Sequence, residues 1–454
     1  MSDESIFAVS VSAVAVVWLA VMWRRGPNVA TGVAAFVAAL MPIWGRIQLW
    51  GLPVDCRTAT AGVALLWICL DRRGRVTSPL VLLDGLVAAL IVWHVVSDTN
   101  AQGFSPAVAV RAYGEWALPY LMGRLAIRRP EHAQTLSVWG AGVLAVLGLL
   151  AACEPLLGFN PYDAIFGPPK DSLFPRDILR YGRRRAMGPT EHPIFLGLIL
   201  LTLLPWAASL WGRRGKFRAW SAVCTLLGLL GVASTLSRAP VMAVGIAAVV
   251  LLAVRFRWLR WPVGIAAVAA AVLIGVFPTK TAMALSRLTG EDRQRTDVEI
   301  RGQRYEVSGT LFRVQLVRHY WPAFEEAGPL GYGTRRAKGF PPDVPHLGDN
   351  ERTKYILRAV DNSYLLLGLR FGWVGSGLFA VLLFAGVWTG LRLADVRMWF
   401  GVPPALAAAV AAVIPTLLTV YLAYDYAFEL LTAVGFIAAI ASIERGERLG
   451  RSVA

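Results

Sequence analysis

The sequence has few charged residues for its length. Only 16 % of its 454 residues are Asp, Glu, Lys or Arg, whereas 56 % are apolar, and the mean hydropathy is +0.55. Soluble domains usually contain about 25 % charged residues. The composition therefore excludes an ordinary soluble protein, although the length alone would suit about three soluble domains.

Several enzyme motifs are also missing. There is no P-loop, no Rossmann glycine pattern, no G-x-S-x-G, no H-E-x-x-H and no Asp-x-Asp pair of the kind used in metal-dependent sugar-nucleotide transfer. The cysteines Cys56, Cys69, Cys153 and Cys224 show no metal-ligand spacing, and a disulfide between Cys56 and Cys153 remains open. We therefore predict neither a metal nor a cofactor.

Repeated apolar runs of about 20 residues indicate an all-α polytopic integral membrane protein with about 12–13 transmembrane helices. The acidic start Met1–Ser5 lacks a following cleavage site, so the first run is expected to be a transmembrane helix and not a signal peptide. The candidate spans are 6–23, 29–45, 58–70, 79–97, 108–127, 134–153, 192–211, 219–235, 238–254, 258–277, 362–390, 398–421 and 424–442.

The net charge of +16 is divided among short segments between the apolar runs, which argues against nucleic-acid binding. Basic residues follow every odd-numbered span, as the positive-inside rule predicts for cytoplasmic segments. Examples are Arg24 and Arg25, Arg255 and Arg257, Arg392 and Arg397, and Arg445 and Arg448. We expect a multi-pass protein of the plasma (inner) membrane, with the N-terminus outside and the C-terminus in the cytoplasm.

Three regions follow from this topology. Residues 1–277 hold transmembrane helices 1–10 and an outer segment at 154–191, residues 278–360 form a large extracytoplasmic loop, and residues 361–454 hold helices 11–13 and a cytoplasmic tail. In the loop, apolar residues at 311, 312, 316 and 320 predict an amphipathic helix, and Gly328–Gly333 predicts a tight turn.

Arginines in the two outer segments are candidate ligands for an anion. Arg185 lies in the first segment, and Arg313 and Arg318 lie in the second. Guanidinium groups suit phosphate, although pairing with acidic residues of the same loops is the alternative. Arg238, after Ser237, begins the ninth span, where a cation opposes the helix dipole and is costly near hydrocarbon. An anionic partner is therefore expected there, either a protein carboxylate or a bound phosphate.

The residues just before the eleventh span are candidates for acid–base chemistry. Asp361 and Asn362 are both good helix caps. Asp361 could also act as a general base toward a sugar hydroxyl, and the two roles are compatible. Tyr364 belongs to the same segment, and Arg370 lies within the span, where an arginine is by default paired or functional. His192 opens the seventh span; a lone histidine is usually structural, but its neighbour Glu191 and nearby Arg185 keep a binding role open.

In this order, these segments resemble the O-antigen ligase and Wzy-type polysaccharide polymerase superfamily of lipid-linked glycan transferases. The resemblance covers about residues 180–375 by motif and the whole chain by topology. The matching pieces are Arg185–Gly197, Ser237-Arg238, the loop helix with Arg313, Gly328–Gly333, and Asp361-Asn362-Ser363-Tyr364-Leu365 with Gly372.

The resemblance implies a metal-independent, inverting glycosyltransferase that polymerises or ligates oligosaccharide units carried by undecaprenyl pyrophosphate at the outer membrane face. Arg238 and Arg313, supported by Arg185, would hold the pyrophosphate, and Asp361 would take the proton of the acceptor hydroxyl. Ligases usually have His at the position of Asp361, which favours a polymerase and leaves a ligase open. The remaining candidate substrate-binding residues are His192, Ser237, Asn362, Tyr364, Arg370 and Arg318.

The expected partners are the lipid-linked glycan donor, a glycan or lipid-linked acceptor, the bilayer and a chain-length regulator protein. The alternative function is a polysaccharide or lipid-linked oligosaccharide transporter, that is, a flippase. Many transporters contain related halves and broken helices at mid-membrane, and the sequence contains no paired halves.

Overall fold

The computed structural model describes residues 1–49, 52–70, 79–170, 176, 178–213, 215–288, 296–300, 303–307, 309–334, 360–395, 401–420 and 424–453. Helices make up 79 % of it. Within the predicted loop 278–360, residues 289–295, 301–302, 308 and 335–359 lie outside the described residues. All four cysteines are free, so the open pairing of Cys56 with Cys153 does not form here.

Proline opens many of the helices in the first part of the chain. α2, α5, α7, α8 and α9 each begin at a proline, at the position where the missing N–H has no helical partner to lose. The elements up to α9 are α1 (Asp3–Arg25), α2 (Pro27–Ala38), β1 (Arg46–Leu49), β2 (Leu52–Asp55), α3 (Cys56–Leu70), α4 (Leu82–Gln102), α5 (Pro106–Ala112), the π-helix η2 (Tyr113–Ala117), α6 (Leu118–Ala126), α7 (Pro130–Leu157), α8 (Pro161–Phe166), β3 (Leu179–Arg180), β4 (Arg183–Arg184) and α9 (Pro193–Ser209).

The second part of the chain is also helical, apart from one hairpin. Its elements are α10 (Lys216–Ser234), α11 (Arg238–Arg255), the 3-10 helix η3 (Arg257–Leu259), α12 (Arg260–Val276), α13 (Pro278–Leu288), β5 (Thr296–Ile300), β6 (Gln303–Val307), α14 (Gly309–Ala327), α16 (Ser363–Arg392), α17 (Val402–Thr416) and α18 (Tyr424–Val453). The strands form three antiparallel hairpins, β1–β2, β3–β4 and β5–β6. α14 confirms the helix expected at the start of the loop.

The described helices account for the predicted membrane spans. Eight helical stretches among the described residues are long and apolar enough to cross a membrane, namely α1, α4, α7, α10, α11, residues 257–276, α16 and most of α18. Four shorter apolar helices are α2, α3, α9 and α17. The predicted span 108–127 instead folds as α5, η2 and α6 in succession. The chain is therefore an all-α polytopic membrane protein, as predicted.

The position of each helix follows from how its apolar side chains are distributed. α9 is buried on nearly all sides, and its Trp206 packs edge-on between Phe36 of α2 and Phe436 of α18, with ring centroids 5.1 and 4.8 Å away. α12 is also strongly apolar but has no buried residue. A helix that is hydrophobic all round is either a core helix or faces lipid. α9 is thus the centre of the bundle, and α12 is its lipid-facing edge.

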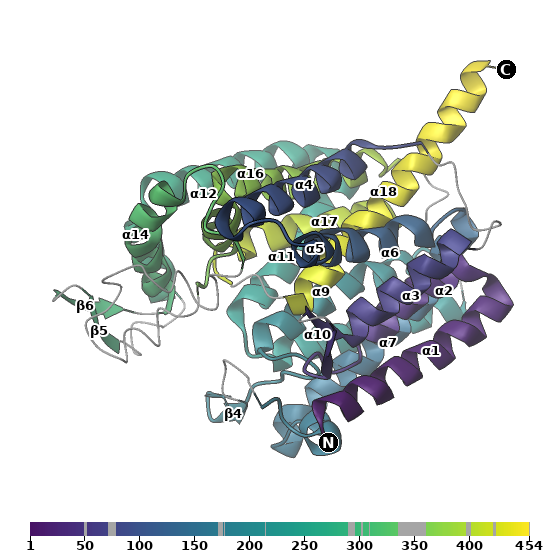
Figure 1. Ribbon diagram of the computed structural model, residues 1–454, viewed down its shortest axis with the longest axis horizontal. Coiled ribbons are helices and arrows are strands. Elements are labelled where there is room, and N and C mark those ends of the chain that lie inside the picture. The colour runs from purple at the N-terminus through teal and green to yellow at the C-terminus, as the bar shows by residue number, and fades with distance from the viewer. Residues whose placement is uncertain are drawn as a thin grey trace.

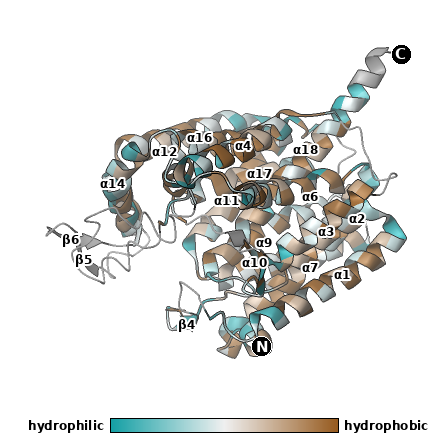
Figure 2. Cartoon of the chain, viewed as in Figure 1, coloured by the Kyte–Doolittle hydropathy of each residue, from teal (hydrophilic) through white to brown (hydrophobic). Residues whose placement is uncertain are grey.

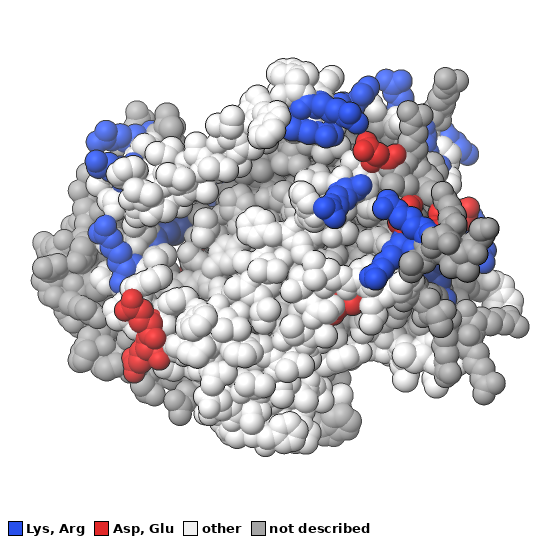
Figure 3. All heavy atoms as spheres, turned by 90° about the horizontal axis from the view of Figure 1, so that it is seen from above, with Lys and Arg blue, Asp and Glu red and all other residues white. Residues whose placement is uncertain are grey.

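The two ends of the molecule differ in what they carry. α14 and the hairpin β5–β6 lie at one end of the long axis, and the C-terminus of α18 lies at the other (Figure 1). The helical body between them is mostly hydrophobic (Figure 2). Charged side chains gather toward both ends and leave a largely uncharged belt between them (Figure 3). This distribution suits a protein whose long axis crosses a bilayer.

A break in α16 joins this helix to the turn after α14. Gly372 interrupts the helix with φ 68° and ψ 178°, a backbone conformation that only glycine adopts readily. The turn Gly328–Gly333 fits into the break, where Tyr332 N donates to Leu369 O at 2.8 Å and Gly333 N donates to Arg370 O at 2.8 Å. The turn therefore fixes the end of α14 against the middle of α16.

Candidate functional site: a cavity lined by arginines

One cavity collects most of the charged residues singled out in the sequence. It measures about 190 Å³ and lies among the β3–β4 hairpin, the first turns of α9 and α11, α14, and the residues before α16. Because four arginines line it with one aspartate, we call it the arginine cavity. Its lining residues are Arg180, Arg185, His192, Ile194, Phe195, Ser237, Arg238, Ala239, Arg313, Asp361 and Val420.

Three helices begin at the arginine cavity. Ile194 lies in the first turn of α9, Arg238 is the first residue of α11, and Asp361 stands two residues before Ser363, which starts α16. The start of a helix carries unpaired N–H groups and the positive end of its dipole. The helix ends therefore add to the positive charge of the arginines, and the cavity favours an anion.

The hairpin β3–β4 brings two arginines to the cavity. Its turn residues Tyr181 and Gly182 have φ of 54° and 71°, the positive values of a two-residue turn that suits the twist of a hairpin. Arg180, at the end of β3, donates from Nη1 to Leu236 O at 2.9 Å, and this contact anchors the hairpin beside the start of α11.

Arg185 is held on the opposite side of the same segment. Its Nε donates to Thr235 O at 3.1 Å, and its Nη2 donates to Ser237 Oγ. Both partners are neutral oxygen atoms. Burial, together with the nearby charge of Arg180, lowers the pKa of Arg185 to about 10, so its guanidinium is still charged at neutral pH.

A buried carboxylate holds the loop that carries Arg185 and His192. Glu154, at the end of α7, is fully buried and accepts hydrogen bonds at Oε2 from Met187 N at 2.9 Å and Gly188 N at 3.0 Å. Its Oε1 lies 3.6 Å from Arg184 Nε. Asn160 Nδ2 donates to Gly188 O at 3.0 Å and closes the same loop from α8.

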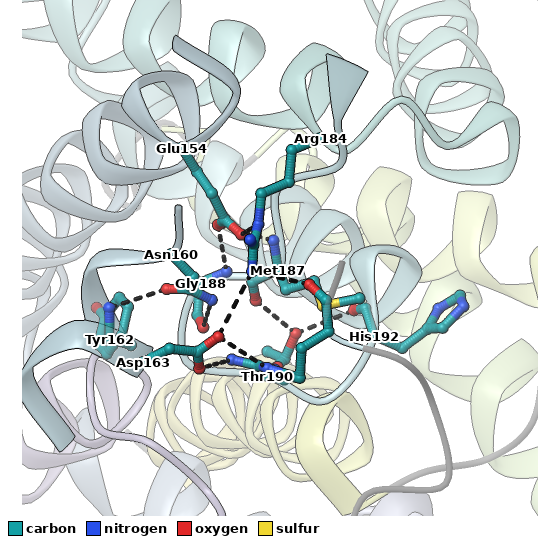
Figure 4. Close-up of polar contacts among 10 residues, drawn as sticks. Glu154, Asn160, Tyr162, Asp163, Arg184, Met187, Gly188, Thr190 and His192 are labelled. Atoms are coloured by element: carbon teal, nitrogen blue, oxygen red, sulfur yellow. Dashed lines mark hydrogen bonds and ion pairs between the residues drawn. The ribbon is translucent and has the colours of Figure 1, made fainter. Parts of the chain in front are cut away.

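A second carboxylate fixes the other half of this loop. Arg176 forms an ion pair with Asp163 and donates from Nη1 to Thr190 O at 2.6 Å. Thr190 Oγ1 in turn donates to Met187 O and to His192 O. Figure 4 shows that the His192 ring points away from this network while its backbone belongs to it. The network is thus a scaffold that presents His192.

His192 and Asp361 have opposite protonation tendencies. Burial and the charges of Arg185 and Arg313 lower the pKa of His192 to about 3, so its ring is neutral. Its Nδ1 accepts from Ile194 N at 3.2 Å and caps α9. Burial raises the pKa of Asp361, and the neighbouring Arg313 charge opposes that rise. A carboxylate with a raised pKa is a better proton acceptor than an exposed one.

The structure brings six of the ten predicted site residues into the arginine cavity and places four elsewhere. The six are Asp361, Arg238, Arg313, Arg185, His192 and Ser237. Asn362, and not Asp361, caps α16, because its Oδ1 accepts from Leu365 N at 3.0 Å. This leaves the Asp361 side chain available to the cavity.

The other three predicted residues lie outside the cavity lining. Tyr364 Oη donates to Ile414 O at 3.0 Å in the contact between α16 and α17. Arg370 stands at the break in α16, where its carbonyl accepts from the docked turn. Arg318 is exposed and donates to Thr279 Oγ1 at 3.1 Å. The contacts of these three residues hold neighbouring elements together.

Arg180 and Tyr181 are polar residues at the site that were not among the site residues selected from the sequence. Arg180 lines the cavity, and Tyr181 beside it is 75 % exposed and hydrogen-bonds to Arg238, which lowers the pKa of Tyr181. The sequence feature that could have indicated both residues is Gly182. A Tyr-Gly pair between short strands predicts a two-residue hairpin, which would have placed Arg180 near the run that ends in Arg185.

Among the residues that the structure describes, no group of three or more His, Cys, Asp or Glu side chains could hold a metal ion. No curated protein matches the chain. Residues 222–380, from α10 into α16, match one family model. This stretch includes Arg238, Arg313 and Asp361. The family model is described as O-antigen ligase, so the match supports the superfamily that the motifs of the sequence predicted.

Proposed function

We propose that this protein transfers glycan units from undecaprenyl pyrophosphate to a glycan or lipid-linked acceptor at the outer face of the plasma membrane. The family match supports glycosyl transfer in a membrane setting. The observation that supports a pyrophosphate-linked donor is the arginine cavity, in which four guanidinium groups face one carboxylate. Such a surplus of positive charge suits a diphosphate.

The size and contacts of the cavity fit this ligand. Pockets that enclose a drug-sized ligand measure roughly 300–1,000 Å³. At about 190 Å³, the arginine cavity is smaller than these pockets, so it would take the pyrophosphate, while the glycan and the lipid extend outside. Arg180 and Arg185 donate to neutral oxygens, and Arg313 Nη1 donates to Gly309 O at 3.3 Å. These contacts orient the guanidinium groups without neutralising them.

The chemistry follows from the charges. As the bond between the anomeric carbon and the pyrophosphate oxygen breaks, negative charge grows on the leaving group, and fixed arginines stabilise it. Asp361 accepts the proton of an acceptor hydroxyl whose oxygen forms the new bond to the anomeric carbon from the opposite face. The products are an inverted glycosidic bond and undecaprenyl pyrophosphate. Because His192 Nδ1 accepts from Ile194 N, the neutral ring carries its proton on Nε2. His192 can therefore donate a hydrogen bond to either substrate but does not supply positive charge.

Helix direction supports an outward-facing cavity. α11 begins at the cavity with Arg238 and ends with Arg255, and α16 begins beyond Asp361 and ends with Arg392. Basic helix ends face the cytoplasm in most membrane proteins. The cavity at the opposite ends of the two helices would then face outward, where assembled lipid-linked units are joined. Asp361 at the position before Asn362 favours a polymerase over a ligase.

The test uses Asp361→Asn and Arg238→Ala, with Arg287→Ala as the control, because Arg287 is an exposed arginine of α13 outside the cavity. The proposal expects normal membrane expression of all three variants. Asp361→Asn and Arg238→Ala should abolish long polymer and leave single lipid-linked units on the outer face. Full-length polymer in Asp361→Asn would refute the base assignment, and units retained on the cytoplasmic face would indicate a flippase.

A further inference from the structure

A second cavity lies next to the arginine cavity and differs from it in charge. It measures about 290 Å³ and is formed by the β1–β2 hairpin, the start of α3, the α5–η2 region and Glu191. Its charged lining residues are Arg46, Asp55, Arg111, Glu115 and Glu191. We call it the mixed-charge cavity. The rest of its lining is largely apolar, with Ile43, Leu52 and Val54 among the residues.

Two consecutive residues line the two cavities. Glu191 lines the mixed-charge cavity, and His192 lines the arginine cavity. Consecutive Cα atoms are about 3.8 Å apart. Because both residues belong to the loop held by the Glu154 and Asp163 network, their positions are fixed relative to each other. The linings of the two cavities therefore meet at Glu191 and His192.

Hydrogen bonds hold two of the charged groups of the mixed-charge cavity. Asp55 Oδ1 accepts from Thr58 N at 2.8 Å at the start of α3. Arg111 Nη1 donates to Thr334 Oγ1 at 2.9 Å. Thr334 directly follows the turn that fixes α14, the helix of Arg313. Asp55 and Arg111 are thus oriented by the protein itself, and Arg111 is linked through Thr334 to the turn that follows α14.

The charges of the lining disfavour an anion, and its mixture of charged and apolar groups suits a sugar. Three carboxylates against two guanidinium groups would repel a phosphate. A neutral polyhydroxylated ligand can use both kinds of group, because carboxylates accept hydrogen bonds from hydroxyls and guanidinium groups donate to hydroxyl and ring oxygens. Apolar residues among them can cover the C–H faces of a sugar ring. A glycosyl-transfer reaction needs one such substrate beside the diphosphate donor.

We propose that the mixed-charge cavity binds the terminal sugars of the acceptor glycan and directs one hydroxyl past His192 toward Asp361. This inference rests on the proposed function, because it assigns the second substrate of the same reaction. Glu115, Glu191 and Arg46 are then acceptor-binding residues, and the donor does not contact them.

The test measures transfer by the purified full chain in nanodiscs. The donor is the repeat unit on a prenyl pyrophosphate, and the acceptor is the same oligosaccharide released from its lipid by mild acid and labelled at the reducing end. Glu115→Gln and Glu191→Gln keep the side-chain size and remove the charge. We expect each to raise the KM for the acceptor about tenfold, the effect of losing a charge-assisted hydrogen bond, with donor KM unchanged. Glu131→Gln, an exposed site at the start of α7, should behave as wild type.

Wild-type activity separates the two proposals. If the wild-type protein transfers no sugar from the pyrophosphate lipid, the proposed function fails. If it transfers sugar but both variants keep the acceptor KM within about twofold, less than any charged hydrogen bond is worth, the acceptor assignment alone is wrong. A rise in the donor KM instead would assign the cavity to the donor and also overturn the inference. Arg46→Ala gives an independent third measurement with the same expected pattern.

Discussion

Substituting Gly372 with alanine should break the contact between α16 and the turn Gly328–Gly333 that follows α14. Gly372 has φ 68° and ψ 178°, and non-glycine residues in such sparsely populated regions cost about 1–3 kcal/mol. An added Cβ would also meet Pro329 O and Leu330 N of the docked turn, the latter at 2.5 Å. The neighbouring atoms are backbone, so the turn must move as a unit.

The size of the effect follows from the contacts that the turn would lose. Tyr332 N and Gly333 N each donate to α16 carbonyls at 2.8 Å, and Trp373 N donates back to Gly328 O at 3.2 Å. At about 1 kcal/mol for each lost hydrogen bond, the three contacts add about 3 kcal/mol to the backbone strain. The total of about 4–6 kcal/mol is a large part of the 5–15 kcal/mol that stabilises a typical protein.

Gly377 provides a matched control in the same helix. A Cβ built there meets nothing within 4 Å, and alanine is a better helix former than glycine by about 1 kcal/mol. Thermal unfolding of the purified protein, followed by tryptophan fluorescence, should show a large fall in Tm for Gly372→Ala and no fall for Gly377→Ala. Equal Tm values for the two variants would show that the turn Gly328–Gly333 does not pack into the break at Gly372. Transfer should fall with Gly372→Ala, because α14 carries Arg313 into the arginine cavity.

Three further predictions concern acid–base chemistry and the scaffolds. The transfer rate should fall as the pH drops through the raised pKa of Asp361, because the protonated carboxyl cannot act as a base; in Arg313→Ala the acid limb of the kcat profile should move to higher pH, since the opposing charge is gone. Glu154→Ala should lower the free energy of unfolding by at least about 1–3 kcal/mol, because two buried N–H groups lose their acceptor. Asp98→Ala should lower Tm as well, because the carboxylate accepts from Thr334 N at 2.6 Å and is buried against His94; chemical unfolding curves of both variants, with Glu131→Ala as a surface control, measure these losses.

The helices of this fold could be predicted because a long apolar run between basic residues forms few structures other than a membrane-spanning helix. α1 and α7 are such runs. The π-helix η2 was not foreseeable, since Gly114 and Glu115 interrupt the apolar pattern and only the packing against α4 and α6 decides the local geometry. The break at Gly372 was hidden for a similar reason. A single glycine in an apolar run is compatible with a continuous helix, and its conformation here depends on a turn some forty residues earlier.

The candidate site was predictable where helix starts could be read from the sequence. Pro193 and Pro240 mark the starts of α9 and α11, so His192 and Arg238 could be placed at helix N-termini. The choice of cap between Asp361 and Asn362 could not be made, because both side chains accept the same hydrogen bond. The structure gives the cap to Asn362, and that choice determines which of the two reaches the cavity.

Arg184 and Arg185 show how a uniform run of arginines acquires two roles. Arg184 turns toward carboxylates, with Nε 3.6 Å from Glu154 Oε1 and Nη2 3.6 Å from Asp163 Oδ2. Arg185, the next residue, meets only neutral oxygens among its described hydrogen-bond partners and lines the arginine cavity. Because the backbone is extended at the end of a strand, successive side chains point to opposite sides. Arg184 therefore pairs with the carboxylates of the scaffold, and Arg185 keeps its positive charge at the arginine cavity.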